Sequence, residues 1–277
     1  MNKVSKKSNL QKPSLETITT AASDMQSEVS QQSNTETVEK QRVFIPLSVN
    51  IVTQAKDAEY LPALLETIPN GCEIVLLVTE CSDDKKGVEF NGTMEYNDSI
   101  IQQYTWYYKL FDFSQARNIA LKHSTRDWVM WLDTDDRLLL SDAKYYQELS
   151  EVPTGVGGFV CGCVGYTAPY LDNHGGTGCT PQVRIFRRHE KIKWTGIVHE
   201  QIIGSIEKEQ LQIKSSPILI QHVGYEQDVH VMYAKLNRNV ELLIRQLAVY
   251  PEQDARYYQE SLINSLIELH KLQDKLL

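Results

Sequence analysis

The sequence predicts an α/β protein whose central sheet is mostly parallel, and two successive strand and helix units carry that prediction. In the first, residues 46–54 have the pattern of a strand, 59–68 carry leucines at helical spacing, and 73–79 form a continuous apolar run. Such a run is typical of a strand buried on both faces. In the second, a helix predicted over 113–123 precedes a short buried strand over 127–132. Parallel sheets carry functional side chains at the carboxyl ends of their strands, so the site is expected there.

The remainder of the chain is predicted to complete the sheet and then to become helical. Residues 156–166 form an apolar run that contains glycines, and 182–187 and 218–223 are candidate strands. From about residue 228 onward, apolar side chains recur at helical spacing on both sides of Pro251. Because proline ends a helix, we expect two antiparallel helices whose leucines form core.

The composition limits the classes of function. The 277 residues are 42% hydrophobic and carry a formal net charge of -8. This is enough apolar material for one domain with a substantial core. An acidic balance argues against broad, non-specific binding to nucleic acid or to an anionic membrane. No stretch approaches the ~20 apolar residues of a membrane span, and the polar N-terminus lacks the apolar segment of a secretory signal. The sequence therefore predicts a cytoplasmic protein.

The chain is predicted to have three parts. Residues 1–42 contain no aromatic residue and are dominated by polar side chains. Such a segment cannot bury enough apolar surface to offset the entropy of ordering, so it is predicted to be disordered. Residues 43–228 are the predicted α/β domain, and 229–277 are the predicted C-terminal helical hairpin.

The five cysteines are an odd number without a CxxC pair, which indicates reduced thiols rather than a disulfide framework. Cys161 and Cys163 lie two residues apart in an apolar run, so on a strand they share one face. Core packing is favoured over a metal pair.

The run WLDTDDRL is the sharpest chemical feature of the sequence. Asp133 and Asp135 follow a buried strand, where two carboxylates are costly unless a cation neutralises them. At this spacing on a strand, both side chains point in the same general direction. Hard oxygen ligands suit Mg²⁺ or Mn²⁺, which can bridge a diphosphate. On spacing alone, a solvated acidic loop is an equal alternative.

Further motifs stand around this run in a fixed order. FSQARN lies upstream, and RIFRR, KIKWTGIVHE and QHVGY lie downstream. This succession resembles the family 2 glycosyltransferases of the GT-A fold, especially the bacterial branch with (F)xxARN, WLDxDD/E, RxFR and GxxHE motifs. The resemblance spans roughly residues 48–249. It implies a Rossmann-like nucleotide-sugar-binding domain over 43–228, followed by the helical hairpin that is frequent in this branch.

The resemblance implies roles for several residues. Asp133 would lie near the ribose and diphosphate, and Asp135 would coordinate Mn²⁺ or Mg²⁺. Arg117 would contact the nucleotide through its guanidinium, and Asn118 is interpreted as structural. Glu200 occupies the position of the base that removes the acceptor proton in an inverting transfer.

Five further residues are expected to contact the nucleotide or the sugar, and the sequence after one of them departs from the family pattern. Thr53 and Gln54 end the first strand, at the edge that receives the base in the family. Glu80 is the candidate carboxylate that recognises the base. The glycine that is usual in the following turn of the family is missing here. A UDP-sugar is the default donor. Trp194 could stack on a sugar or be core. His199 is assigned to the nucleotide-sugar site beside the proposed base.

One histidine and three arginines near strand ends are candidates for contact with the metal or the diphosphate. His222 is a possible third metal ligand or diphosphate contact, with a satisfied core histidine as the alternative. Arg184, Arg187 and Arg188 include candidates for pairing with diphosphate, and strand alternation puts Arg184 and Arg188 on one face. The glycine-rich loop 169–180 is interpreted as an acceptor lid, with an ordinary surface loop as the alternative.

The sequence therefore predicts an inverting, metal-dependent glycosyltransferase that acts on a soluble acceptor. That acceptor could be a glycan, a peptide or a modified nucleic-acid base, whose hydroxyl or thiol attacks the sugar. A DNA-base glycosyltransferase of the same fold and a non-catalytic nucleotide-sugar-binding scaffold are the alternatives. Nucleotidyl transfer ranks last because no glycine-rich phosphate loop follows the first strand. The C-terminal helices could also form a homo-oligomer.

Overall fold

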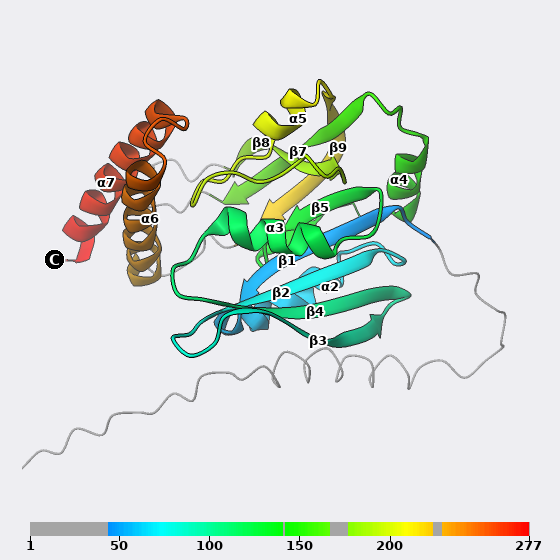
Figure 1. Cartoon of the computed structure of the whole chain (residues 1–277), viewed down its shortest axis with the longest axis horizontal. Coiled ribbons are helices and arrows are strands. Elements are labelled where there is room, and N and C mark those ends of the chain that lie inside the picture. The colour runs from blue at the N-terminus through cyan, green and yellow to red at the C-terminus, as the bar shows by residue number, and fades with distance from the viewer. Residues whose placement is uncertain (1–43, 141, 167–176, 224–228, 277) are drawn as a thin grey trace, which may run out of the picture.

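The computed structural model describes residues 44–140, 142–166, 177–223 and 229–276. The predicted disordered tail, residues 1–42, lies outside the described residues, as does most of the predicted lid. A nine-stranded sheet runs through the described chain in the order β3-β4-β2-β1-β5-β8-β7-β9-β6 (Figure 1). Its strands are β1 (Leu47–Gln54), β2 (Glu73–Cys81), β3 (Gly87–Tyr96), β4 (Ser99–Tyr108), β5 (Trp128–Leu132), β6 (Asp136–Leu138), β7 (Val156–Tyr166), β8 (Thr177–Arg187) and β9 (Gln212–His222).

Apart from α3, the helices described before β9 are short, whereas the last two helices are long. Those described are the 3-10 helices η1 (Ala55–Tyr60) and η2 (Glu148–Glu151), and the α-helices α2 (Leu61–Leu65), α3 (Phe113–His123), α4 (Ala143–Gln147), α5 (Ile203–Lys208), α6 (Val229–Val249) and α7 (Ala255–Leu276). The predicted helix over 59–68 is thus divided between η1 and α2, with Pro62 in the first turn of α2. Proline fits a helix start, which accounts for the break.

The parallel half of the sheet confirms the predicted α/β class. β1 pairs in parallel with both β2 and β5, and β2 pairs in parallel with β4. Val75 and Leu77, on one face of β2, are as fully buried as Ile74 on the other, as expected for a strand covered on both sides. Because β1 has a parallel neighbour on each side, the chain changes its direction of travel across the sheet beside it, and such switch points are where α/β proteins bind ligands.

The β3–β4 hairpin was not predicted. Its turn is Asn97-Asp98, and both residues have positive φ angles, 46° and 61°. Asparagine and aspartate tolerate that conformation, which two-residue hairpin turns require. The two flanking runs contain β-branched and aromatic residues, which favour strands. Together with the Asn-Asp turn, they could have predicted the hairpin.

The sheet must curl, because the short link between β5 and β6 cannot cross it when flat. β8, β7 and β9 lie between β5 and β6 in the sheet, yet residues 133–135 alone join β5 to β6 in the chain. Four strand spacings of about 4.8 Å amount to roughly 19 Å, whereas four extended residues reach about 14 Å at most. β6 is thus brought back toward the end of β5, where residues 133–135 lie.

α6 and α7 form the predicted helical pair beside the sheet (Figure 1). Leu243 and Tyr258 are buried against Ile197 and Val198, so the pair packs on the segment that follows β8. The expectation that the leucines of these helices are core holds only in part, because Leu266 is 46% exposed. None of the described helices is long and apolar enough to cross a membrane.

The cysteines are free thiols, as predicted, and Cys161 and Cys163 are buried. Cys161 belongs to the main hydrophobic core that spans both halves of the sheet. Burial raises the pKa of Cys161 to about 12, so its thiol stays protonated.

Candidate functional site

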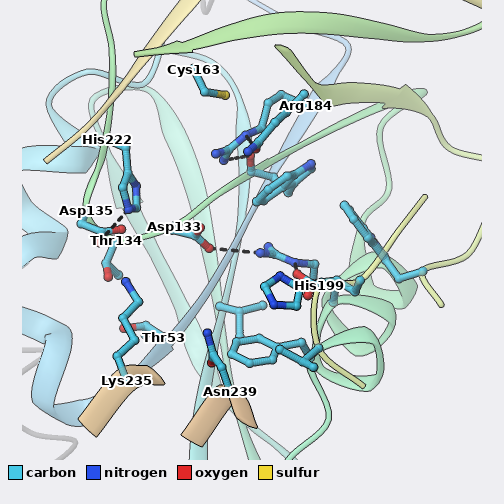
Figure 2. A pocket seen from close by; sticks show the side chains of 18 of the residues that line it. Thr53, Asp133, Thr134, Asp135, Cys163, Arg184, His199, His222, Lys235 and Asn239 are labelled. Carbon is cyan, nitrogen blue, oxygen red and sulfur yellow. Dashed lines mark hydrogen bonds and ion pairs between the residues drawn. The ribbon is translucent and has the colours of Figure 1, made fainter. Parts of the chain in front are cut away.

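The acidic run lies in a turn at the carboxyl end of β5. The amide of Asp136 donates to the carbonyl of Asp133 at 3.0 Å and closes this turn. The prediction that Asp133 and Asp135 project from an extended strand is therefore wrong in its geometry. Both carboxylates nevertheless face the same place: one ligand atom from each of Asp133, Asp135 and His222 lies within 4.8 Å of the others (Figure 2). The curl of the sheet supplies His222, the last residue of β9.

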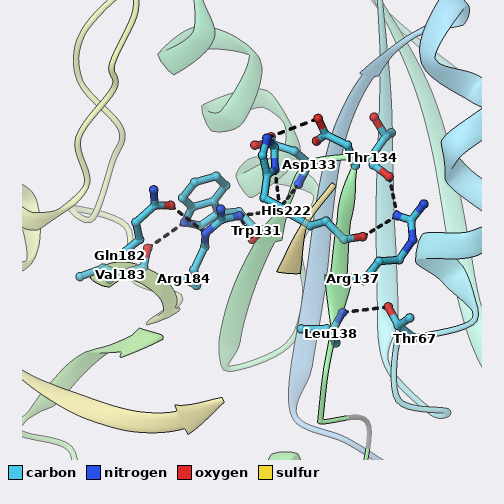
Figure 3. Close-up of polar contacts among 12 residues, drawn as sticks. Thr67, Trp131, Asp133, Thr134, Arg137, Leu138, Gln182, Val183, Arg184 and His222 are labelled. Carbon is cyan, nitrogen blue, oxygen red and sulfur yellow. Dashed lines mark hydrogen bonds and ion pairs between the residues drawn. The ribbon is translucent and has the colours of Figure 1, made fainter. Parts of the chain in front are cut away.

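Asp136 fixes the positions of Asp133 and His222 through hydrogen bonds, a role that was not predicted from the sequence. Its carboxylate is fully buried and accepts hydrogen bonds from Arg184 Nη1 at 2.6 Å and from the Asp133 amide at 2.9 Å. His222 Nδ1 lies 2.9 Å from the other carboxylate oxygen (Figure 3). In the neutral imidazole that donates from Nδ1 to this carboxylate, Nε2 carries no proton and can bind a metal; it lies 3.4 Å from Asp135.

The pKa shifts of the two carboxylates in the acidic turn have opposite directions. Burial favours the neutral form of Asp133, but Arg117, Arg184 and His222 outweigh it, and the pKa of Asp133 is lowered. At Asp135 burial prevails over the attraction of His222, and the pKa of Asp135 is raised. The pKa of His222 is raised as well, because its bond to Asp136 and the nearby carboxylates overcome burial. Two carboxylates and one imidazole are a donor set that fits Mn²⁺ or Mg²⁺.

Arg117 connects the acidic turn to the predicted base. It lies in α3, which begins where the Asp112 side chain accepts from the Gln115 amide. Its Nη2 donates to Asp133 at 3.2 Å and its Nε donates to Glu200. The guanidinium also stacks 4.0 Å from the ring centroid of Trp131. Two residues assigned to opposite ends of the reaction thus share one cation.

The segment that carries His199 and Glu200 is fixed by neighbours on three elements. Asn118 of α3 bonds both the amide and the carbonyl of Trp194, which confirms its structural interpretation. The buried side chain of Gln246 in α6 accepts from the Ile197 amide. At Gly196, where φ is +99°, a Cβ would collide with the hydroxyl of Tyr258 in α7. The helical pair therefore holds this segment in position.

A cavity of about 830 Å³ opens over these residues. It brings together nine of the ten residues assigned to the site from the sequence, namely Thr53, Gln54, Arg117, Asp133, Asp135, Trp194, His199, Glu200 and His222. Glu80 is exposed and does not belong to the lining. Its side chain therefore does not fit the role of base reader.

Trp194 is only 5% exposed, and its ring meets Trp131 and Phe186 edge to face. This favours the core alternative over stacking on a sugar. His199 has a φ of 51°, an uncommon backbone conformation for this residue type. Burial lowers the pKa of His199 and thus favours its neutral form.

The three arginines of RIFRR have protein partners. Arg184 is bound to Asp136, Arg187 donates to the carbonyls of Val152, Pro153 and Val156, and Arg188 donates to the carbonyl of Arg126. Arg184 lines the cavity, while Arg187 and Arg188 lie outside its lining. The bonds of Arg187 and Arg188 hold the fold, and a contact of Arg184 with a diphosphate stays a prediction. The described end of the predicted lid, from Thr177 onward, is strand β8 rather than a loop; its residues 169–176 lie outside the described part of the chain.

The cavity also has a wall on η1 and α6, and the part on α6 was not predicted from the sequence. The residues of this wall include Lys56, Asp57, Tyr60, Lys235, Arg238 and Asn239. Lys235 and Asn239 extend from α6 into the cavity beside Thr53 (Figure 2). Both side chains are polar, as on the solvated face of a surface helix, so sequence periodicity gave no reason to assign them to a site.

The fold and the site together define an α/β protein with an acidic site, fit for a divalent cation, at the carboxyl ends of its parallel strands. No protein-family model matches the chain. It is similar to the SPbeta prophage-derived glycosyltransferase SunS of Bacillus subtilis strain 168 and to the glycosyltransferase SunS of Bacillus phage SPbeta. Each is 25% identical over 180 residues, which are 65% of this chain and 40% of the relative. The match thus spans less than half the length of these glycosyltransferases.

Solved structures give weaker likenesses. One is the mannosyltransferase PcManGT from Pyrobaculum calidifontis in complex with GDP-Man and Mn²⁺, with a TM-score of 0.44 and 14% identity over 91% of this chain and 79% of that one. Another is S. aureus TarS 1-349 in complex with UDP, with a TM-score of 0.37 and 12% identity over 79% of this chain and 70% of that one.

Proposed function

We propose that this chain is a divalent-metal-dependent glycosyltransferase, of the family 2 type, that moves a sugar from a nucleoside-diphosphate sugar to an acceptor with inversion. The observation that carries the proposal is the convergence of Asp133, Asp135 and His222 within 4.8 Å, beside the pair formed by Arg117 and Glu200. The similarity to two glycosyltransferases supports it. A cytoplasmic location, a soluble acceptor and a catalytic domain over 43–228 remain predictions of the sequence.

The residues divide into two groups in this proposal. Asp133, Asp135 and His222 Nε2 would hold Mn²⁺ or Mg²⁺, which when bound supplies positive charge to a leaving diphosphate. Asp136 keeps His222 in the tautomer that this requires. The protein's other contribution is to exclude water and to fix the donor in the cavity.

Glu200 is the proposed base. It forms an ion pair with Arg117 and lines the cavity, and a carboxylate can accept a proton from an acceptor group. The acceptor hydroxyl or thiol gives its proton to Glu200 as its oxygen or sulfur forms a bond to the anomeric carbon. The bond from that carbon to the diphosphate oxygen breaks, and the nucleoside diphosphate leaves with the electron pair.

Calorimetry with UDP, GDP, CDP and TDP, each with and without Mn²⁺, tests this function. We expect at least one diphosphate to bind the wild type only when Mn²⁺ is present. Asp135→Asn, which keeps the shape of the side chain, is expected to abolish that binding, while the exposed variant Asp83→Asn retains it. Absence of binding by all four nucleotides to the folded wild type would refute the proposal.

A further inference from the structure

The lining of the cavity connects the acidic turn both to the proposed base and to a region between η1 and α6. Beside Glu200, the lining includes Trp194 and Gln201. Between η1 and α6 it includes a slot, where Asp57 and Arg238 belong to the lining. A nucleoside-diphosphate sugar bound through its diphosphate must place its sugar toward one end and its nucleoside toward the other. Because Glu200 has to meet the sugar, the slot receives the nucleoside.

Asp57 and Arg238 are charged residues in the slot. Both are partly buried, and among the residues that the structure describes they do not form an ion pair with each other. Burial raises the pKa of Asp57 and lowers the pKa of Arg238, although each charge favours the other. Arg238 Nη2 donates to Asn239 at 3.2 Å, but Arg238 Nε is buried without a hydrogen-bond partner. Buried polar groups in this state are stabilised when a ligand supplies the missing partner.

The slot also has flat apolar surfaces. The guanidinium of Arg238 lies 5.4 Å from the ring centroid of Phe113, and both residues line the cavity. Tyr60, in the same helix as Asp57, is 36% exposed and belongs to the lining as well. Aromatic rings beside a planar guanidinium suit a planar heterocycle better than a sugar or a phosphate.

A carboxylate and a guanidinium recognise complementary parts of a nucleobase. The carboxylate can only accept hydrogen bonds, and the guanidinium can only donate them. Together they fit a base edge on which a ring N–H stands beside a carbonyl oxygen, as in uracil, thymine and guanine. Cytosine and adenine present a ring nitrogen without hydrogen at the corresponding position, so the Asp57 carboxylate would face another acceptor.

We propose that Asp57 and Arg238 form the nucleobase subsite of the donor and select a base with a ring N–H next to a carbonyl group. Asp57 thereby takes the role that the sequence analysis gave to Glu80, which lies outside the cavity lining. This assignment rests on the proposed function, because it assumes that the acidic turn receives a diphosphate. Lys235, between the slot and Asp135, belongs to the same wall of α6.

The experiment compares affinities within one chemical series in the presence of Mn²⁺, using UDP, TDP, GDP, CDP, ADP and inorganic pyrophosphate. The wild type is expected to bind at least one of the first three about tenfold or more tightly than CDP and ADP. Asp57→Asn should lose most of that preference, since an amide both donates and accepts, while its affinity for pyrophosphate stays within about twofold of the wild type. Arg238→Lys keeps the charge but not the planar fork, and should show a smaller loss of preference.

Two further variants make the outcome decisive. Asp83→Asn, an exposed change outside the cavity, is the matched control and should behave as the wild type. A wild type that prefers CDP or ADP overturns the subsite, as does a preference kept by Asp57→Asn and lost by Glu80→Gln. Pyrophosphate binding that disappears in Asp135→Asn but not in Asp57→Asn separates the two sites. If the folded wild type binds no nucleoside diphosphate at all, the proposed function fails and the subsite falls with it.

Discussion

Two adjoining regions of the site hold carboxylates in opposite ways. Asp136 is fully buried, and its charge is balanced inside the protein by Arg184 and His222. Asp133 and Asp135 precede it in the same run but face the cavity, and there the pKa of Asp135 is raised by burial. A carboxylate with a complete set of protein partners fixes the local structure, whereas carboxylates that face a cavity can bind an external cation.

The largest expected effect lies in the balanced region. Arg184→Met should lower the free energy of unfolding by about 3–5 kcal/mol, because it leaves Asp136 as a buried charge without its cation. Urea denaturation followed by circular dichroism measures this loss. A change below about 1 kcal/mol would show that Asp136 is not anchored by Arg184 and would erase the contrast between the two regions.

The next effect distinguishes the two regions directly. Without metal, Asp136→Asn should destabilise the protein, whereas Asp135→Asn should leave it as stable or more stable because it removes a carboxylate whose charged form is disfavoured by burial. With Mn²⁺ at about 100 times its dissociation constant, the wild type should gain about 2.7 kcal/mol, and Asp135→Asn should gain little. Thermal unfolding with and without Mn²⁺ measures both. A full gain in Asp135→Asn would contradict the assignment of this carboxylate as a ligand.

A smaller effect concerns pH. The pKa of His222 is raised in the fold, so the stability that its protonated form contributes is complete below its ordinary value of 6.5 and is lost as pH rises through the raised value. In metal-free buffer, the stability difference between the wild type and His222→Gln should therefore be larger near about pH 6 than near about pH 9. Denaturation at both values tests this, with the exposed His270→Gln as control. A difference that does not vary with pH would argue against the coupling of His222 to the carboxylates.

The smallest effect belongs to an ion pair at the surface. Lys191→Met breaks the contact of Lys191 with Glu209, in which the lysine side chain is 62% exposed. Such pairs contribute about 0.2–1 kcal/mol. A loss of stability as large as that expected for Arg184→Met would show that burial does not determine how much an ion pair contributes to stability in this protein.

The sequence predicted the parallel half of the sheet and the acidic end of β5, because continuous apolar runs and an acidic cluster are local signals. It also gave His222 as a candidate third metal ligand, on its position at a strand end and without any geometry. It could not predict that Arg117 joins Asp133 to Glu200, since the arginine and the glutamate are 83 residues apart. Pairings over such a distance depend on how the elements pack.

The misses have physical reasons of the same kind. Asp136 looked like one more acid of a polar turn, and only the return of β9 beside β6 shows that it is buried. Glu80 was assigned by its position after β2, but β2 continues through Cys81 and leaves that side chain exposed. Asp57 lies in η1 and Arg238 lies in α6. Sequence periodicity does not predict that these two helices line the same cavity.

The curl of the sheet also sets an order of events during biosynthesis. Asp136 and His222 are 86 residues apart, so the acids of the turn are synthesised well before the strand that completes their surroundings. Contacts of such sequence separation form late, because the loop between them must close first. Until β9 docks beside β6, the chain has the acids without the imidazole. A divalent cation can therefore stabilise the finished sheet by mass action, but it gives little support to the intermediates that precede it.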